Sequence, residues 1–559
     1  MTEARSRTEL LRNIPELENN EKLLSECISI CKDYNVSGDN FFWIWESLRY
    51  GSSNAALGAE RPTFTAAHAE SVKIKLADEV KAKRLKEQKE QMNAQRRQLA
   101  LAHLVRKAPR GSGSDAKLAV TTAPSVSFKI PIEDRRTRKY RYMYEKISEK
   151  SEILDERIDE FGELVREHYN VDDLGDPSAT SEEDVVVVGR ICNDPDSANA
   201  SAKLTEGAIF LESSRMMGSG SRVPLRFSSS LKLRGAPQGA NSIGLFPGSI
   251  VALRGRNGGG GFFAVEEILS LPMPSPSTEP PNHKAFTMAM ACGPYTADAD
   301  LEYKYFNALM EKLRSSAPSV LLLLGPFIDA AHPLIKSGEV EEIPAKIFKR
   351  RFVEPLEGFL KASPQSLILL GPSIRDILSD HPVYPQCELD NVPFNDPRIK
   401  LIPNPSRFTI NDVSFGSTSV DILFHIRNQE YAQRGAVVDP MPPVTPESSG
   451  TDPLTNSCRQ LLCQRHSFYP LFPVPTDLSA EVNLDVSHSD GLRLDQRAHQ
   501  HAPDVLLLPS KLKQFTKMVD GTWAVNPSFL MKGTYASISV PDTPRSELRR
   551  AIRCEIVKL

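Results

Sequence analysis

The hydrophobic positions of the chain change their period along its length, and these changes divide it into regions. In the first region the apolar residues recur three to four positions apart within 20-NEKLLSECISICKDY-34, at Leu23, Leu24, Cys27, Ile28 and Cys31. That spacing covers one face of an α-helix. A second helix is expected over 39-DNFFWIWESLRYG-51, with Asp39 as its N-cap. Residues 1–75 therefore predict a small helical domain.

Apolar positions become sparse between residues 76 and 138, where basic residues are frequent. The stretch KAKRLK at 81–86 suits a nuclear-import signal or a contact with nucleic-acid backbone, although charge runs more often form a solvated helix. Residues 108–125 are rich in Gly, Ser and Pro and indicate a flexible tether. A helix with a loose apolar stripe is expected from 140 to 170, and segment 139–180 ends in an acidic loop.

From residue 184 the pattern changes to short runs rich in β-branched residues. The run 185-VVVVGRI-191 is followed by AIFLESS, RVPLRF, GSIVALRGR and FFAVEEIL. About five strands with irregular loops predict a small barrel such as an OB-fold over 181–272. The glycines of 255-GRNGGGGFF-263 are assigned to a hairpin turn and not to a phosphate loop, because no Lys-Ser/Thr pair follows them.

After a proline-rich hinge the chain alternates short apolar runs with amphipathic stretches. The runs expected to form buried strands are FTMAMACG, SVLLLLGPF, QSLILLGPS, SVDILFHI and PDVLLLPS. Helices are expected between them, over 301–316 and 343–362. Residues 283–559 thus predict a layered α/β domain, whose chemistry would lie at the carboxyl ends of its strands.

Composition narrows the class of protein. With 559 residues the chain needs several cores, and its 40% hydrophobic and 25% charged content is ordinary for a globular protein. A net charge of −3 gives no overall preference for nucleic acid or for acidic substrates. No apolar stretch is long enough for a membrane span, and the N-terminal residues lack the apolar core of a signal peptide. Eight cysteines over this length favour a reducing compartment, the cytosol or the nucleus.

The strand ends can be compared with the two-metal site of calcineurin-like metallophosphoesterases. Those enzymes carry D-x-H, G-D-x-x-D, G-N-H-[DE] and G-H-x-H after successive strands, because two adjacent cations need a bridging carboxylate and several His and Asp ligands. This chain keeps glycines and Asp329 of the second motif, but Pro326 stands at the bridging position, and proline cannot bind a metal through its side chain. The corresponding positions are Cys292, Gly325, Pro326, Asp329, Gly371, Pro372, Ser373, Pro509 and Ser510. We expect no metal, no cofactor and no catalysis there.

A rebuilt metal site could be drawn from Asp329, His332, Asp376 and His381, but it would lack a bridging carboxylate. Asp329 and His332 are therefore expected to structure their turn. Two further histidines, His425 and His466, lie on predicted loops or strand ends, and His499 with His501 forms an H-x-H pair. Cys458, Cys463 and His466 faintly resemble zinc ligands, but their spacing favours cysteines that pack in the core.

The order of domains, together with several short motifs, resembles the B-subunit family of replicative DNA polymerases, and within it the branch that serves DNA polymerase α–primase. The segments that carry this resemblance are 246-FPGSIVALRG-255, 291-ACGPYT-296, 325-GPFIDAAHP-333, 372-PSIRD-376 with 382-PVYPQ-386, 415-FGSTSVDILFH-425, 464-QRHSFYPLFP-473 and 503-PDVLLLPSKL-512. They lie between residues 185 and 540, whereas the first 180 residues match only in layout. The chain departs from the family pattern in insertions around 195–203 and 256–261 and in 435–453, all expected to form loops, and in the segment after Val540, whose role is not inferred.

The resemblance implies a non-catalytic regulatory scaffold that acts in the nucleus at the initiation of replication, where RNA–DNA primers are made. In the family, the barrel and an inactive phosphoesterase domain hold the zinc-bearing C-terminal region of the catalytic subunit, and the primase subunits join through the complex. The N-terminal helical domain docks other replication factors, and DNA contact would be indirect or weak. The alternatives are a B-subunit of polymerase δ or ε, an active metallophosphoesterase, and an OB-fold that binds single strands.

Overall fold

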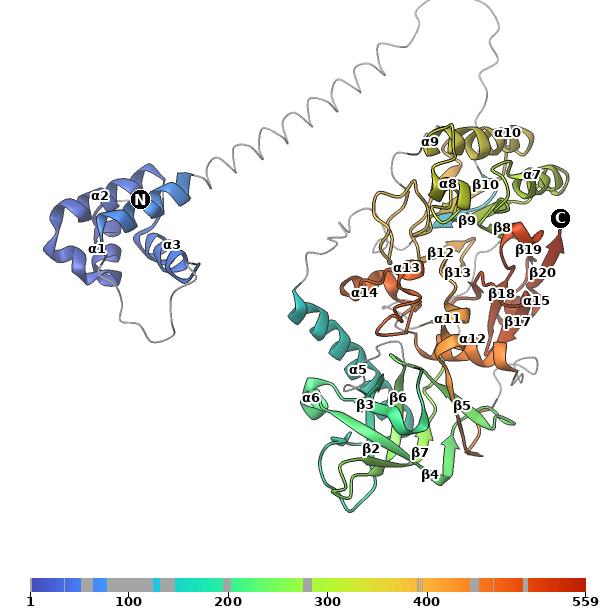
Figure 1. Ribbon diagram of the computed structural model, residues 1–559, viewed down its shortest axis with the longest axis horizontal. Helices are drawn as coiled ribbons and strands as arrows, with labels where there is room; N and C mark the ends of the chain where they lie inside the picture. The colour runs from blue at the N-terminus through green and yellow to red at the C-terminus, as the bar shows by residue number, and fades with distance from the viewer. Residues whose placement is uncertain are drawn as a thin grey trace, which may run out of the picture. The chain divides into compact units, whose positions relative to one another are not determined.

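The computed structural model describes residues 3–34, 36–51, 64–77, 124–130, 146–194, 203–274, 284–389, 392, 394, 396–442, 452–465, 467–495 and 501–559 (Figure 1). The chain divides into two compact units, residues 1–119 and residues 120–559. The stretch KAKRLK, His466, His499 and most of the predicted tether lie outside the described residues. Within the described residues, no helix has the length and apolar content needed to cross a membrane.

The N-terminal unit is a cluster of short helices, as its apolar spacing predicts. Its elements are α1 (Glu3–Asn13), the 3₁₀ turn η1 (Pro15–Asn19), α2 (Glu21–Asp33), α3 (Gly38–Gly51) and a helical stretch over 66–77. The predicted stripe of α2 is buried in the core of this unit. The predicted cap of α3 is wrong by two residues: the Ser37 hydroxyl accepts the Asn40 N–H at 3.2 Å, and Asp39 lies in the first turn.

The barrel is a closed sheet in the order β15-β4-β3-β2-β6-β7, with β4 also pairing with β7. Its sequential elements are β2 (Val185–Asn193), the 3₁₀ turn η3 (Glu206–Ala208), β3 (Ile209–Glu212), α6 (Arg215–Gly218), β4 (Arg222–Arg234), β5 (Ser242–Leu245), β6 (Ile250–Arg256) and β7 (Phe263–Leu269). β6 and β7 are antiparallel, so the glycine-rich segment between them is the predicted hairpin turn. The preceding helix, α5 (Ile147–Tyr169), packs its apolar face on β2 and β6.

Two strands reach the barrel from a distant part of the sequence. β14 (Tyr431–Arg434) pairs with β5 in a separate two-stranded sheet, and β15 (Ala436–Val438) lies parallel to β4 at the end of the barrel sheet. The prediction of a loop over 435–453 is therefore wrong at its start. These short segments become strands only by pairing with strands about 190 to 200 residues earlier, and nothing local in the sequence indicates that pairing.

The remaining residues form a sandwich of two six-stranded sheets. One sheet has the order β11 (Ile399–Leu401), β10 (Leu367–Gly371), β9 (Val320–Leu324), β8 (Phe286–Cys292), β19 (Thr534–Val540) and β20 (Arg553–Lys558). The other has the order β1 (Phe128–Lys129), β12 (Ser406–Ile410), β13 (Val413–Ser417), β16 (Val505–Leu507), β18 (Thr522–Asn526) and β17 (Phe515–Val519). Apolar side chains from both sheets form one shared core between them.

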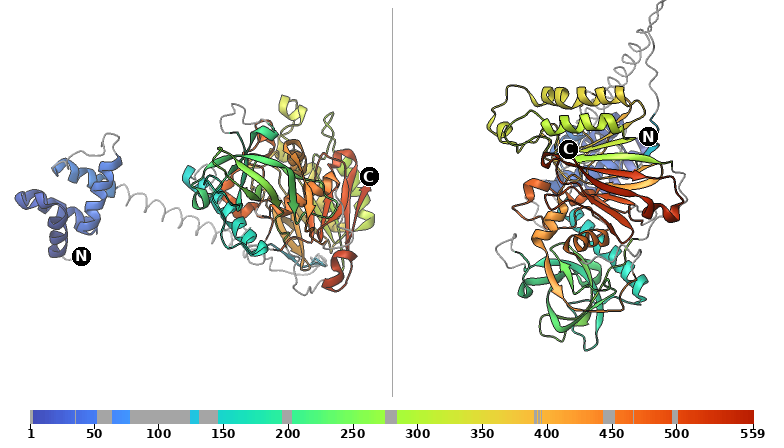
Figure 2. Two further views of the ribbon diagram at one scale, coloured as in Figure 1. Left: turned by 90° about the horizontal axis from the view of Figure 1, so that it is seen from below. Right: turned by 90° about the vertical axis from the view of Figure 1, so that its right-hand side faces the viewer.

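Helices cover both outer faces of the sandwich, and Figure 2 (right) shows the yellow-green and yellow ones beside the sheets. The first set is α7 (Lys304–Ser316), α8 (Pro333–Ser337), α9 (Pro344–Phe348), a π-helical turn η4 (Lys349–Val353) and α10 (Glu354–Ala362), with the 3₁₀ turn η7 (Leu530–Lys532). The second set is α11 (Ile422–Gln429), α12 (Pro453–Cys463), α13 (Ser479–Val482), the 3₁₀ turn η6 (Val486–His488) and α14 (Ser489–Leu492). The prediction of a strand over SVDILFHI is wrong. Most of this run lies in α11, and Asp421 caps the N-terminus of that helix.

Two edge strands come from segments that sequence reasoning did not place in the sheets. β1 lies inside the region predicted as linker, and it pairs with β12 while Val126 and Ile130 enter the shared core. The segment after Val540 forms α15 (Arg545–Ala551) and β20, which pairs with β19. Two arginines of α15, Arg545 and Arg549, both bond to the buried Asp504 carboxylate before β16. This segment is therefore an integral part of the sandwich.

Candidate functional site

The positions that match the metal ligands of phosphoesterases lie where the strands predict them. Cys292 ends β8, Gly325 and Pro326 follow β9, and Gly371 ends β10 before Pro372 and Ser373. These three strands are parallel, so their carboxyl ends share one edge. Pro509 and Ser510 follow β16 of the other sheet. These positions therefore lie at or just after strand ends, as their spacing after apolar runs predicts.

The loops after β8, β9 and β10 are in direct contact, and this contact requires glycine. The Cys292 Sγ lies 3.3 Å from the Gly325 carbonyl oxygen. A Cβ placed on Gly293 would overlap the Pro326 carbonyl, and one on Gly325 would overlap the Asp376 Oδ2 and lie 2.7 Å from the Ser373 nitrogen. No room is left between these loops for a side chain.

Asp376 is the central side chain of this contact and is used as an internal hydrogen-bond acceptor. Its Oδ1 accepts the backbone N–H groups of Phe327 and Ile328, and its Oδ2 accepts that of Ser373 at 2.8 Å. Burial raises the pKa of the Asp376 carboxyl to about 7, and the three backbone donors oppose this increase. The carboxylate thus joins the loop after β9 to the loop after β10.

Asp329 and His332 structure their turn, as the sequence predicts. Asp329 forms an ion pair with Arg375 and accepts the Ala331 N–H at 2.9 Å. His332 is the N-cap of α8: its Nδ1 accepts the Leu334 N–H at 3.3 Å, and its Nε2 lies 3.0 Å from the Ala297 carbonyl oxygen. Each of these side chains already has partners in the loops around it.

The loop after β16 meets a buried carboxylate that sequence reasoning did not find. Asp421 accepts the Lys511 N–H at 2.7 Å and the Phe424 N–H at 3.1 Å. Burial raises the pKa of Asp421, against the effect of the Lys511 N–H and the Ser510 hydroxyl. The Ser510 N–H itself donates to Asn526 at 2.9 Å. The only local indication of Asp421 was its suitability as a helix cap.

A network of neutral polar side chains joins the loop after β10 of the first sheet to the loop after β13 of the second. The Ser419 hydroxyl donates to the Pro372 carbonyl at 3.0 Å and accepts from Asn404 at 2.8 Å. Gln386 donates to the Ser373 carbonyl at 3.2 Å. Amide and hydroxyl groups of this kind hold loops together at pH 7 without adding charge.

The remaining histidines and cysteines lie in separate environments. His425 is buried in α11, with Nδ1 3.0 Å from the Tyr469 hydroxyl and Nε2 3.2 Å from Glu481. Cys458 lies on the buried face of α12, and the Cys463 Sγ lies 3.1 Å from the Met273 sulfur. Among the residues that the structure describes, no three His, Cys, Asp or Glu side chains are grouped so that they could hold a metal ion.

Comparison with known proteins agrees with this combination of barrel and sandwich. Residues 288–517 match the family of the DNA polymerase alpha/epsilon B-subunit, and residues 151–271 match the OB domain of the DNA polymerase alpha B-subunit. The DNA polymerase alpha B-subunit of Schizosaccharomyces pombe is 34% identical over 442 residues, which are 75% of this chain and 72% of that protein. This chain belongs to the DNA polymerase alpha B-subunit family.

Two further members of the family give the extent of the likeness. The polymerase alpha B-subunit of Saccharomyces cerevisiae is 30% identical over 75% of this chain and 63% of its own length. That of Rattus norvegicus is 28% identical over 73% of this chain and 63% of its own length. The chain thus spans somewhat under two thirds of the length of these two relatives.

In this member of the B-subunit family the barrel and the sandwich are joined through buried contacts. The Gln464 side chain donates to the Ile250 carbonyl at 2.8 Å and accepts its N–H at 3.0 Å, so α12 is joined to β6. The Phe472 N–H donates to the Pro247 carbonyl at 3.0 Å, and a Cβ on Gly248 would overlap the Phe472 nitrogen. These close approaches keep the two parts in one fixed arrangement.

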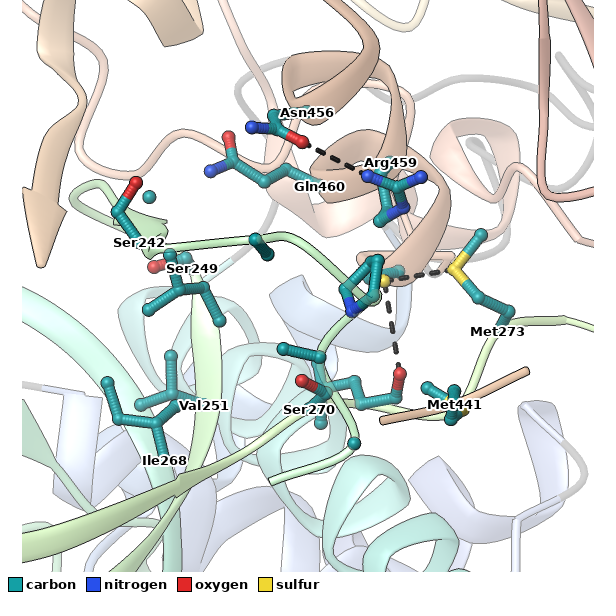
Figure 3. A pocket seen from close by; sticks show the side chains of 18 of the residues that line it. Ser242, Ser249, Val251, Ile268, Ser270, Met273, Met441, Asn456, Arg459 and Gln460 are labelled. Atoms are coloured by element: carbon teal, nitrogen blue, oxygen red, sulfur yellow. Dashed lines mark hydrogen bonds between the residues drawn. The ribbon is translucent and has the colours of Figure 1, made fainter. Parts of the chain in front are cut away.

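A cavity of about 610 Å³ lies beside this junction. Figure 3 shows Asn456, Arg459 and Gln460 of α12 on one side of it, and Val251 and Ile268 of the barrel on the other. Charged groups sit at its margin, where Arg459 pairs with Asp520 at 2.8 Å. A cavity of this size with an apolar interior is the usual form of a ligand or side-chain pocket.

The helix beside the cavity begins at Asp452, whose charge contributes to stability. Asp452 caps α12 by accepting the Leu454 and Thr455 N–H groups, and it pairs with Lys517 at 2.8 Å. Burial raises the pKa of Asp452, but the bonds from Lys517 and Thr455 lower it to about 2.

Asp452→Asn is expected to lower the free energy of unfolding by about 1 kcal/mol at pH 7, a value reduced by solvent screening of this partly exposed pair. Because the folded pKa lies below the unfolded one, the stabilisation is present above about pH 4 and is lost as the pH falls toward 2. Urea unfolding from pH 6 to pH 3 should show the two proteins converging. Asp542→Asn, at an exposed position, is the control; a difference that stays constant with pH would contradict the assignment.

Proposed function

We propose that this chain is the non-catalytic regulatory and scaffold subunit of the DNA polymerase α–primase complex. The observation that carries the proposal is its membership of the DNA polymerase alpha B-subunit family, with matches to both the barrel and the sandwich. The contacts at the strand ends support it. Asp329, Asp376 and Asp421 are engaged with an arginine or with backbone donors, so the edge that could support chemistry is used for structure.

We further propose that the sandwich derives from a calcineurin-like phosphoesterase whose metal site has been lost. The parallel order of β8, β9 and β10 and the glycine after β9 suit that origin. Pro326 would stand in place of the bridging carboxylate, and Pro372 and Ser373 in place of the Asn-His pair. Positions Cys292, Gly325, Asp329, Gly371, Pro509 and Ser510 would be the other remnants. Without a bridging carboxylate, two cations could not be held close enough to activate a phosphate ester.

As a scaffold, the chain would present a rigid platform and a separately folded N-terminal unit. The barrel and sandwich share buried contacts through Gln464, so a partner bound across them would be held in one geometry. We infer that this platform holds the C-terminal region of the catalytic subunit, with the primase subunits joined through the complex. The N-terminal unit would dock other replication factors, and the chain would act in the nucleus. Linking two binding units raises the effective concentration of one partner near the other.

Affinity purification of the tagged chain from nuclear extract tests this function. The expected result is recovery of the large catalytic chain of polymerase α together with both primase subunits, in amounts comparable to the bait. The untagged chain, carried through the same procedure, is the control. Recovery of a polymerase δ or ε catalytic chain would assign the protein to another branch, and recovery of no polymerase chain would contradict the proposal.

A further inference from the structure

The cavity beside the junction of the barrel and the sandwich is larger than a packing defect. Its volume is about 610 Å³. An apolar cavity of about 150 Å³ is already enough to bind benzene, and small-molecule sites in proteins measure about 300 to 1,000 Å³. The cavity therefore has room for a molecule of several rings.

The walls of the cavity come from both parts and are fixed by hydrogen bonds. Gln464 of α12 bonds to the Ile250 backbone of β6 through both its amide oxygen and its amide nitrogen, and β14 pairs with β5 along its whole length. On the barrel side, the Ser249 hydroxyl donates to the Phe246 carbonyl at 2.7 Å. Walls held in this way cannot move inward without losing buried hydrogen bonds, so the cavity stays open.

The charged side chains of the cavity wall are paired with one another. Arg459 and Asp520 lie 2.8 Å apart, and Arg427 lies 2.7 Å from Glu430. Glu430 also accepts from the Gln460 amide nitrogen at 2.8 Å. The Gln460 Oε1 has no partner among the described residues, but it is shielded from solvent and so from a ligand as well. A charged ligand would therefore lose its hydration here without gaining a counter-charge.

The accessible part of the wall is apolar and adaptable. Met273 and Met441, which Figure 3 shows on the right-hand side of the cavity, are half-buried, as is Ile243 of β5. Burial raises the pKa of the Cys463 thiol beside Met273 to about 12, so this group is uncharged at pH 7. Methionine side chains are flexible and make favourable contacts with aromatic rings. Poorly ordered water at such a wall is readily displaced by an apolar group.

We propose that this cavity is the binding site for an uncharged, apolar small molecule of several rings. The paired charges disfavour an ionic ligand. A cavity of about 150 Å³ holds one benzene ring, so a single inserted aromatic side chain would leave most of this volume unfilled. The ligand would contact α12 and the barrel at the same time, so its binding would stabilise the junction between the two parts.

Nile red, an uncharged dye of several fused rings whose fluorescence rises in apolar surroundings, is the probe for this site. Fluorescence titration of the full chain is expected to give a stoichiometry of one, with a dissociation constant on the order of 10 µM. Saturating dye should raise the unfolding temperature by about 3 °C. The anionic dye anilinonaphthalene sulfonate should bind at least about tenfold more weakly. Tighter binding of the anionic dye would contradict an uncharged ligand.

Met441→Glu places an unpaired carboxylate on the cavity wall and should weaken Nile red binding at least about tenfold. The Met441 backbone bridges to that of Pro237, so a change of side chain leaves this pairing in place. Ser242→Glu, on another wall, is a second variant with the same expected loss. Met441→Leu should keep the dye, as should Ala436→Glu, whose new charge lies on an exposed position of β15. Equal binding by Met441→Glu, Ser242→Glu and Ala436→Glu would place the dye elsewhere and overturn the proposal.

The alternative occupant is an apolar side chain of a partner protein, and the test for it rests on the proposed function. The dye signal that Met441→Glu abolishes is compared between the free chain and the complex purified from nuclear extract. Equal signals support a small-molecule site, whereas loss of the signal in the complex would overturn it in favour of a protein contact. If no polymerase chain is recovered, the proposed function fails, and titration of the free chain still decides whether the cavity binds the dye.

Discussion

Asp376→Ala is expected to lower the free energy of unfolding by about 4 kcal/mol. The substitution leaves the buried N–H groups of Phe327, Ile328 and Ser373 without an acceptor, and each such group costs about 1–3 kcal/mol. Release of a buried carboxylate from a low-dielectric site offsets part of that loss. Urea unfolding at pH 7, followed by circular dichroism, measures the difference.

The contribution of Asp376 to the free energy of unfolding should also depend on pH. The folded pKa, raised by burial to about 7, lies above the unfolded value of about 3.9. Between these values the folded chain holds a proton that the unfolded chain releases. The contribution of Asp376 to stability is therefore full below about pH 4 and declines as the pH rises through 7. Asp376→Asn should remove this part of the slope.

The exposed carboxylate Asp298 provides the control, because Asp298→Ala should change stability by less than about 0.5 kcal/mol. If Asp376→Ala were as mild as this control, the carboxylate could not be the acceptor that joins the two loops. A loss of bound metal on substitution, with stability unchanged, would assign Asp376 to a metal site instead.

Gly248→Ala should separate the barrel from the sandwich, at a cost of about 4 kcal/mol in the free energy of unfolding. Gly248 has a φ of +96°, and its added Cβ would overlap the Phe472 nitrogen and lie 2.9 Å from the Leu471 carbonyl carbon. These are backbone atoms, so relief requires that the two parts move apart. Thermal unfolding should then show two transitions in place of one, and limited proteolysis should cut at the junction.

Gly239→Ala is matched to this variant. Gly239 also has a positive φ, of +83°, but nothing lies within 4 Å of its Cβ position. It should cost only the strain of the left-handed conformation, about 1 kcal/mol. Equal effects of the two substitutions would mean that backbone strain alone, and not the approach of Gly248 to Phe472, accounts for the loss.

The sequence predicted those elements whose pattern is local. The run 185–191 and the leucine run before Gly325 both form the predicted strands, because short apolar runs of this kind favour a buried strand whatever their distant partners. The error at α11 has a definite cause: SVDILFHI is short and apolar, and such a run fits a buried helix as well as a strand. Asp421, which caps that helix, was the one local signal that could have decided between them.

Elements that depend on distant partners could not be predicted in this way. β1 and β15 are two and three residues long and become strands only through pairing with β12 and β4. The residues of the candidate site also fall into those that a local pattern predicts and those that it does not. The glycines and prolines at the strand ends follow from spacing, but Asn404 and Gln386 come from loops without any period.

The position of β19 in its sheet constrains when this domain can fold during synthesis. β8 lies between β9 and β19, yet its residues 286–292 precede residues 534–540 of β19 by about 250 positions. Core residues of β8 such as Met288 would wait exposed on the ribosome until that strand and Ile552 emerged. Pairings this distant along the chain form slowly and leave apolar strands open to aggregation. The first sheet of the sandwich can therefore close on β8 only after residues 534–552 have been synthesised.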